Sequence, residues 1–381
     1  MFTPDLFLMA PPAGSAREVT PNAYVVVVDN AGDMRIYEDD GAGTLDEVGT
    51  YDIQLDSTQN AVIDLFGRYN QLAIKNGYLY HPVSGDSTIY VYDIADPTNI
   101  TLAGSTGSLS GIGSSVAIHP DYDWLVSVNH GNTITVFDVS NFNSITEIDS
   151  VSYSTIFPQS LNPSKQVNIV PNAGSYGTVF WSVDQTALAH SFDSSGNLSY
   201  EEDTDIIQDT TYAQSFTVSE FIHSNCGSRS STSGSTQMLS ALGDDNICFI
   251  SRVGPNDISE VTSETAVFDD ARGSADLGPY LPNYDASDEA AWVVGATDDD
   301  SLVLIGRPTA SGTYDIYGET GADTRLNGVY AVVAYNEFVY AFGYNQARIT
   351  KWEWTAKGTL TYEAQNGTNL PSIYVAIGVY Q

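Results

Sequence analysis

The sequence predicts an all-β fold built from repeated four-stranded antiparallel units. Three observations predict it: one stretch with four consecutive strand-like runs, copies of that stretch, and chain ends that complete each other. The clearest stretch is Ser114–Ser150, where runs rich in Val, Ile, Thr and aromatic residues alternate with Asn, Asp, Gly and Pro turns. This pattern is typical of hairpin-linked strands. Such a small sheet has two apolar faces, so it needs neighbours to cover them.

The third run of this stretch and its exit turn recur along the chain. In the reference stretch, the apolar residue Ile145 follows Phe137 by eight positions. We call this third run with its exit turn the sequence frame. It has seven copies along the chain: Ile36-Tyr37-Glu38, Val91-Tyr92-Asp93, Val136-Phe137-Asp138, Ser191–Glu201, Phe249-Ile250-Ser251, Asp315-Ile316-Tyr317 and Glu353–Glu363. Repeats of this length with four strands each are typical of propeller blades. The sequence therefore predicts a seven-bladed β-propeller.

The two ends of the chain predict how the ring closes. Ser372–Tyr380 has the pattern of a first strand with nothing after it, and Ala23–Asp29 that of a second strand with nothing before it. Joined head to tail, they are similar to Val329–Phe342. We therefore expect the C-terminal strand to pair in the first blade, which removes the exposed edges that an open sheet must protect.

The predicted blades cover residues 22–55, 60–106, 112–153, 161–206, 214–268, 286–327 and 328–366. Two stretches, His223–Thr236 and Asp269–Ser287, are longer than ordinary hairpin loops. Long loops in a compact domain are commonly functional or mobile. We expect these two loops to form one surface around blade five.

Residues 1–21 precede the first blade and form a separate N-terminal arm, while residues 22–381 form the propeller. The arm carries five large apolar side chains within its first nine positions: Phe2, Leu6, Phe7, Leu8 and Met9. Burying each of them is worth roughly 1.5–3 kcal/mol, so the arm should be packed. It could pack on its own propeller or on a neighbouring subunit. We expect the second arrangement, because a closed ring leaves little unfilled groove on its rim.

The repeat resembles a known class of proteins in two stretches, Tyr90–Ser105 (YVYDIADPTNITLAGS) and Val116–Val128 (VAIHPDYDWLVSV). These stretches resemble the seven-bladed β-propellers of the YVTN/LVIVD or lactonase-like repeat type, and the resemblance covers residues 22–381. In a lactonase-like propeller, the resemblance implies a metal or a catalytic acid cluster at the central channel. No set of residues in this chain matches such a cluster one by one.

The charge balance is strongly acidic. Asp and Glu total 48 against 13 Lys and Arg, which gives a net charge of −35. In dilute buffer this charge repels itself, whereas at ~1 M salt the screening length falls to about 3 Å. The charge favours adaptation to high salt, with an ordinary acidic extracellular protein as the alternative. Both interpretations exclude nucleic-acid partners, which require basic patches. No stretch approaches the ~18 apolar residues of a membrane span.

The chain has two cysteines, Cys226 and Cys248. They could form a disulfide that ties a long loop to a strand, or remain as two buried thiols. The sequence leaves both alternatives open.

Candidate metal ligands are few. Asp298, Asp299 and Asp300 follow one another in the predicted turn between the first two strands of blade six, where carboxylate oxygens could hold Ca²⁺. The ordered Asp and Gly spacing of a calcium loop is absent, so a solvated turn is the alternative. We expect no other cofactor. The five histidines are scattered, and the motifs of common hydrolases are absent, which favours turn and surface histidines over catalysis.

Together these features predict a non-enzymatic interaction propeller. We expect a structural or host-attachment component of a virion, such as a spike, turret or tail tip, adapted to high salt. Its partners would be neighbouring structural subunits, held through the arm, and a host surface receptor or glycan. The alternative function is a secreted lactonase-like hydrolase or another propeller enzyme.

Overall fold

A computed structural model of the chain describes residues 23–29, 32–41, 43–56, 72–83, 87–109, 113–129, 133–152, 167–170, 176–183, 186–204, 221–225, 236–242, 246–254, 257–265, 271–277, 290–296, 299–306, 316–355, 358–367, 370 and 375–381. The predicted arm, with Phe2, Leu6, Phe7 and Leu8, lies outside the described residues. So do Cys226 and Asp298, and for Cys248 only the backbone is described.

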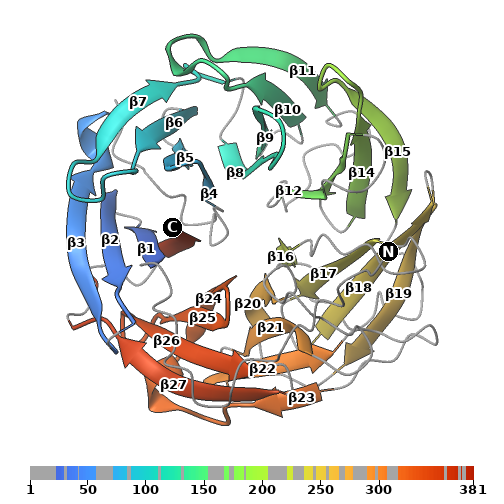
Figure 1. Cartoon of the computed structure of the whole chain (residues 1–381). Helices are drawn as coiled ribbons and strands as arrows, with labels where there is room; N and C mark the ends of the chain where they lie inside the picture. The colour runs from blue at the N-terminus through green and yellow to red at the C-terminus, as the bar shows by residue number, and fades with distance from the viewer. Residues whose placement is uncertain are drawn as a thin grey trace, which may run out of the picture.

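The described strands form seven four-stranded antiparallel sheets, which Figure 1 shows as a ring around a common centre. The predicted all-β, seven-bladed propeller is therefore confirmed. Within the described residues, no helix is long and apolar enough to span a membrane.

In every blade the first strand named is the innermost and the fourth is the outermost. Blade 1 contains β28 (Val375–Tyr380), β1 (Ala23–Asp29), β2 (Asp33–Asp39) and β3 (Leu45–Asp52). Blade 2 contains β4 (Ala73–Lys75), β5 (Tyr78–Val83), β6 (Thr88–Asp93) and β7 (Thr101–Ser105). Blade 3 contains β8 (Gly113–Ile118), β9 (Trp124–Asn129), β10 (Thr133–Asp138) and β11 (Thr146–Ser152). Blade 4 contains β12 (Val167–Val170), β13 (Thr178–Val183), β14 (Thr186–Phe192) and β15 (Leu198–Thr204).

Blade 5 contains β16 (Phe221–Asn225), β17 (Thr236–Leu242), β18 (Asn246–Gly254) and β19 (Asp257–Thr265). Blade 6 contains β20 (Ala271–Asp276), β21 (Ala290–Ala296), β22 (Ser301–Gly306) and β23 (Ile316–Glu319). Blade 7 contains β24 (Val329–Tyr335), β25 (Phe338–Gly343), β26 (Arg348–Thr355) and β27 (Thr359–Gln365). Three short 3₁₀ turns are η1 (Ile53–Leu55), η2 (Phe142–Ser144) and η4 (Thr324–Leu326).

The C-terminal strand closes the ring as predicted. β28 pairs antiparallel with β1 over six positions, from Tyr24 opposite Tyr380 to Asp29 opposite Val375. The Tyr24 and Tyr380 rings lie 5.3 Å apart, and the Tyr380 hydroxyl donates a hydrogen bond of 2.8 Å to the Ile94 carbonyl of blade 2. The last strand of the chain therefore binds both the first blade and its neighbour.

Blade 6 corrects two predictions from the sequence. Its innermost strand, β20, lies in the stretch that was predicted to be a long loop, and Ile316 begins its fourth strand, although the sequence frame assigned Ile316 to the third. The reason is composition. β20 reads Ala-Arg-Gly-Ser-Ala-Asp, without the β-branched and aromatic residues that indicate a strand. Small residues suit an inner strand, where neighbouring blades crowd together.

A β-bulge between the third and fourth strands recurs in every blade and gives a common frame. The residue just before the bulge is Ile36, Val91, Val136, Ala189, Phe249, Leu304 or Lys351. Its partner on the fourth strand is Gly49 in blade 1, Gly104 in blade 2 and Gly318 in blade 6. A Cβ atom at any of these glycines would collide with a backbone carbonyl of the next blade, at Pro97, Phe142 or Gly358.

Blade 3 uses a side chain at the same position. Asp149 faces Val136 across the sheet, and its Oδ2 accepts a hydrogen bond of 2.8 Å from the Leu198 amide of blade 4. The outer edge of a blade thus docks on the exit turn of the next, either through a bare glycine or through a carboxylate. This contact fixes the spacing of the blades, and therefore the positions of the groups that lie between them.

Candidate functional site

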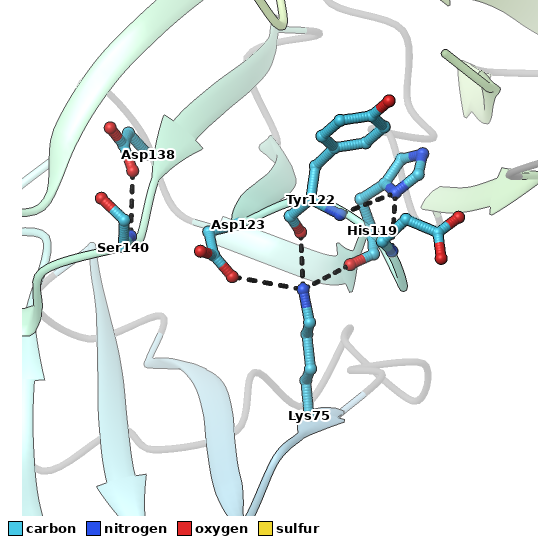
Figure 2. A network of polar contacts seen from close by, with 7 residues as sticks. Lys75, His119, Tyr122, Asp123, Asp138 and Ser140 are labelled. Carbon is cyan, nitrogen blue, oxygen red and sulfur yellow. Dashed lines mark hydrogen bonds and ion pairs between the residues drawn. The ribbon is translucent and has the colours of Figure 1, made fainter. Parts of the chain in front are cut away.

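Among the described residues, groups of polar side chains lie in several inter-blade seams, and three of these groups differ in their hydrogen bonding. The first lies between blades 2 and 3 and is drawn in Figure 2. Lys75, the last residue of β4, directs its ammonium group into the first turn of blade 3. Its Nζ donates to the carbonyls of His119 (3.0 Å) and Tyr122 (2.7 Å) and to Oδ1 of Asp123 (3.3 Å). All three ammonium protons are therefore used by this turn.

His119 continues the same chain of contacts to blade 4. Its Nδ1 accepts hydrogen bonds from the amides of Asp121 (3.1 Å) and Tyr122 (3.3 Å), so the proton lies on Nε2, which donates to the Tyr176 carbonyl at 3.1 Å. Burial lowers the pKa of His119, so the ring is neutral. Both nitrogens have partners, and the imidazole holds the turn instead of facing a substrate.

The equivalent residue of two other blades makes a similar contact. Tyr380 at the end of β28 reaches Ile94 of blade 2, and Tyr335 at the end of β24 donates to Oε1 of Gln381 at 2.8 Å. The network in Figure 2 is thus one member of a series of contacts at the ends of inner strands. Because its donors and acceptors are satisfied, we assign it to blade positioning.

The second seam joins blades 7 and 1. Lys351 and Asp39 form a buried ion pair with Nζ 2.6 Å from Oδ2 and 2.8 Å from Oδ1, and their side chains are only 3% and 4% exposed. The Tyr340 hydroxyl donates to the same carboxylate at 2.6 Å, and the ammonium lies 3.8 Å from the centre of the Phe338 ring. This group is satisfied as well, and it links the last blade to the first.

The third seam, between blades 1 and 2, contains a cluster around Asp56. The Tyr51 hydroxyl donates to Oδ2 of Asp56 at 2.8 Å, and the Tyr90 hydroxyl donates to the Asp56 carbonyl at 3.0 Å. Tyr92 packs against Tyr51, with ring centres 5.3 Å apart. We call Tyr51, Asp56, His81, Tyr90 and Tyr92 the Asp56 cluster.

His81 belongs to this cluster by register. It lies opposite Tyr90, and strand alternation places it on the same face of β5 as Leu79 and Val83, which pack in the apolar cluster shared with blade 1. His81 is fully buried. Within the described residues, neither ring nitrogen of His81 has a hydrogen-bond partner. The Tyr92 hydroxyl interacts with the nearby Asp56 carboxylate but makes no hydrogen bond of full geometry. Buried polar groups without partners are rare in native proteins. Others occur among the described residues, for example Ser127, and this seam is distinguished because it holds His81 and Tyr92 together.

The protonation states follow from burial. Desolvation lowers the pKa of His81 to about 3, so its imidazole is neutral and retains one N–H donor. Desolvation, followed by the Asp56 carboxylate, raises the pKa of Tyr92, which keeps its proton. Desolvation and the hydrogen bond to Asp56 likewise raise the pKa of Tyr51 to about 12. The seam therefore presents the Asp56 carboxylate, which is half-buried, beside neutral donors. Such a set can activate a water molecule and stabilise a developing negative charge.

The predicted metal residues are only partly described. Asp299 and Asp300 lie in the turn between β21 and β22, which are the second and third strands of blade 6 and not the first and second as the sequence indicated. Oδ1 of Asp300 accepts a hydrogen bond of 2.7 Å from the Gly328 amide of blade 7. Within the described residues, no three His, Cys, Asp or Glu side chains are grouped so as to hold a metal. The calcium site, the disulfide and the assembly arm stay predictions.

Comparisons with known proteins give fold relatives only. No protein family matches the sequence, and no curated protein is similar to it. Among solved structures, a candidate 6-phosphogluconolactonase from Bacteroides fragilis is 11% identical with a TM-score of 0.63, over 96% of this chain and all of the other. The periplasmic gluconolactonase of Pseudomonas aeruginosa is 12% identical with a TM-score of 0.60, over 94% of this chain and 99% of the other. A protein from Lactobacillus plantarum is 12% identical with a TM-score of 0.60, over 94% and 100%.

These similarities correct the function expected from the sequence. We expected a non-enzymatic virion component, whereas two of the three structures above carry the names of lactonases, which are enzymes, and none of the three is named as a virion protein. The expectation failed because it depended on global features, namely charge and the absence of recognised motifs. Buried groups such as His81 and Tyr92 belong to no local motif. The signal available in the sequence was the alternation of Leu79, His81 and Val83, which puts the histidine in line with two apolar residues.

Proposed function

We propose that the chain is a lactonase-like hydrolase that opens the ring ester of a sugar lactone. The observation that carries the proposal is the extent of the likeness: both propellers named as lactonases align over nearly their whole length and nearly all of this chain. We also assign the repeats to the YVTN/LVIVD or lactonase-like type, on the two stretches that resemble it. The acidic composition supports a protein that works at high salt.

The Asp56 cluster supplies the groups that the reaction requires. In the proposed reaction, the Asp56 carboxylate takes a proton from a water molecule as the water oxygen attacks the lactone carbonyl carbon. The N–H of His81 and the hydroxyl of Tyr92 stabilise the oxyanion, since both stay protonated at neutral pH. The ring C–O bond then breaks, and the proton on Asp56 passes to the leaving ring oxygen. The product is the open-chain hydroxy acid.

A direct test is the hydrolysis of glucono-δ-lactone, followed by base consumption in a pH-stat at molar KCl, with the spontaneous rate subtracted. We expect catalysis by the native chain, and a loss of about 10²–10⁴-fold in kcat for Asp56→Asn, as for removal of a general base. Asp46→Asn is the matched control. It removes one charge from exposed Asp46, at the far end of β3. Turnover by the native chain no faster than the spontaneous reaction would overturn the proposal.

Tyr92→Phe and His81→Gln test the donors separately from folding. Both substitutions approximately preserve size. His81 has no hydrogen bond to lose among the described residues, and Tyr92 loses only a weak interaction with Asp56. We therefore expect nearly unchanged unfolding curves and a kcat reduced by about 10²–10³-fold per donor, the range for an oxyanion donor. Unchanged kcat in both variants would remove the Asp56 cluster from the mechanism.

A further inference from the structure

We infer that the preferred substrate is a sugar lactone without a phosphate group. This inference rests on the proposed function and concerns which lactone is used. The two named lactonases similar to this chain differ in this respect, since one name specifies a 6-phosphogluconolactone and the other a gluconolactone. The charges of this chain discriminate between the two classes.

The first argument is the charge of the whole molecule. A net charge of −35 generates a negative potential that slows the approach of a phosphate dianion and does not affect a neutral sugar ring. At about 0.15 M salt the screening length is about 8 Å, so the potential extends beyond the surface; at about 1 M it is about 3 Å. The preference for a neutral lactone over a phosphorylated one that this potential creates must therefore decrease as the salt concentration rises.

The second argument concerns the basic side chains. A phosphate site needs a free Arg or Lys, or a cradle of backbone amides. The described basic side chains are already engaged. Lys75 and Lys351 are bound as described above, while Nη1 of Arg35 lies 2.9 Å from Glu47. Nε of Arg325 donates to Asp323 at 2.8 Å, and Arg348 also has a partner. Within the described part of the chain, each cation is thus neutralised by a carboxylate or held by another protein group.

The third argument is the composition of the Asp56 cluster itself. Both Asp56 and Asp52 act electrostatically on Tyr51, so two carboxylates lie near the proposed site. A phosphate dianion is repelled by both carboxylates, whereas a neutral sugar ring carries no charge for them to repel. The charge at the site and the charge of the molecule therefore favour the same class of substrate.

The experiment compares kcat/KM for glucono-δ-lactone and 6-phosphoglucono-δ-lactone at about 0.15 M and about 1 M KCl. We expect a preference for the unphosphorylated lactone of at least about tenfold at low salt, which narrows several-fold at high salt because screening increases. Faster hydrolysis of the phosphorylated lactone, or a preference that does not change with salt, overturns this inference and leaves the proposed function intact. Failure to hydrolyse either lactone overturns the proposed function and this inference with it.

A charge variant locates the effect. Asp52→Asn removes a charge near the cluster but keeps a side-chain oxygen that can accept from the Gln54 amide, as Asp52 does at 2.9 Å. We expect kcat/KM for the phosphorylated lactone to rise about two- to fivefold, with little change for the other substrate. Asp46→Asn changes the net charge by the same amount at the far end of β3. It should leave the ratio of kcat/KM between the two lactones unchanged. If kcat/KM for the phosphorylated lactone rose equally in both variants, the charge of Asp52 near the site would have no special effect on substrate choice.

Discussion

The ammonium group of Lys351 lies 2.6 Å from the carboxylate of Asp39 in the seam that joins the last blade to the first. Removing one partner of a buried ion pair leaves an uncompensated charge, which typically costs about 3–5 kcal/mol. We therefore expect Lys351→Met to lower the free energy of unfolding by about that amount in denaturant titrations. Arg35→Met is the control, because the Arg35 and Glu47 side chains are 25% and 32% exposed, far more than Lys351 and Asp39, and this pair should be worth less than about 1 kcal/mol. Equal effects of the two substitutions would contradict a special role for the buried pair.

Deletion of residues 375–381 should open the ring. The deletion removes β28, the innermost strand of blade 1, and exposes the edge of β1 along the six positions that β28 covers. Exposed edges of this kind promote association between chains. We expect a lower melting temperature and higher oligomers in size-exclusion chromatography. A soluble, monomeric and equally stable truncated protein would show that the strand is dispensable.

Gly104→Ala tests the contact between neighbouring blades. The added Cβ would collide with the Phe142 carbonyl, and overpacking of this kind typically costs about 1–3 kcal/mol. Gly367→Ala is the matched control, because a Cβ at Gly367 would meet no atom within 4 Å. We expect chemical denaturation to show a lower free energy of unfolding for Gly104→Ala and no change for Gly367→Ala. An unperturbed Gly104→Ala would mean that the blades can shift at little cost.

Stability should fall as the pH is lowered from about 6.5. Burial lowers the pKa of His81 to about 3 and that of His190 to about 4, against about 6.5 in an unfolded chain. The unfolded state therefore takes up protons first, and stability is lost progressively from pH 6.5 down to the folded pKa values. At pH 5 each histidine contributes a loss of about 2 kcal/mol.

The measurement is the free energy of unfolding at pH 7 and pH 5 in constant molar KCl. His81→Leu should decrease the pH-dependent loss by about 2 kcal/mol, and at pH 7 it should be nearly neutral because an apolar group replaces an unpaired polar one. If His81→Leu retains the full pH dependence, the histidine is not buried and neutral in the folded protein.

Salt should stabilise the fold over a wide range. With a net charge of −35, repulsion between carboxylates is strong in dilute buffer and is largely screened at ~1 M KCl. We expect the melting temperature to rise between ~0.1 M and ~2 M KCl, as followed by circular dichroism. The buried Lys351–Asp39 pair should not contribute to this change. A melting temperature independent of salt would remove the interpretation as a salt-adapted protein.

The sequence predicted the architecture because each blade repeats a local pattern. Strand alternation, the apolar residue eight positions after Phe137, and the complementary ends depend on short stretches that retain their composition. In blade 6 the predicted strands were numbered one too low, because the innermost strand was missed. That strand contains Gly273, Ser274 and Ala275, which do not have strand-forming composition. Here tertiary packing decides the structure and local propensity does not.

The candidate site was not predictable in the same way. His81 and Tyr92 come from adjacent strands, and Asp56 comes from the preceding blade, so only folding brings them into one seam. The histidines also differ from the prediction of turn and surface residues, since His81, His119 and His190 are all buried. A linear sequence records neither burial nor an unpaired nitrogen.

The pairing of β28 with β1 has a consequence for the order of the chain. Tyr24 and Tyr380 are direct neighbours in this antiparallel pair, so Gln381 could be joined to Ala23 through a tight turn of about two to four residues. Such a link would make the first blade a continuous meander like the other six. The seven blades then have no intrinsic beginning, and a circularly permuted chain that starts at β4 would preserve every strand pairing described above.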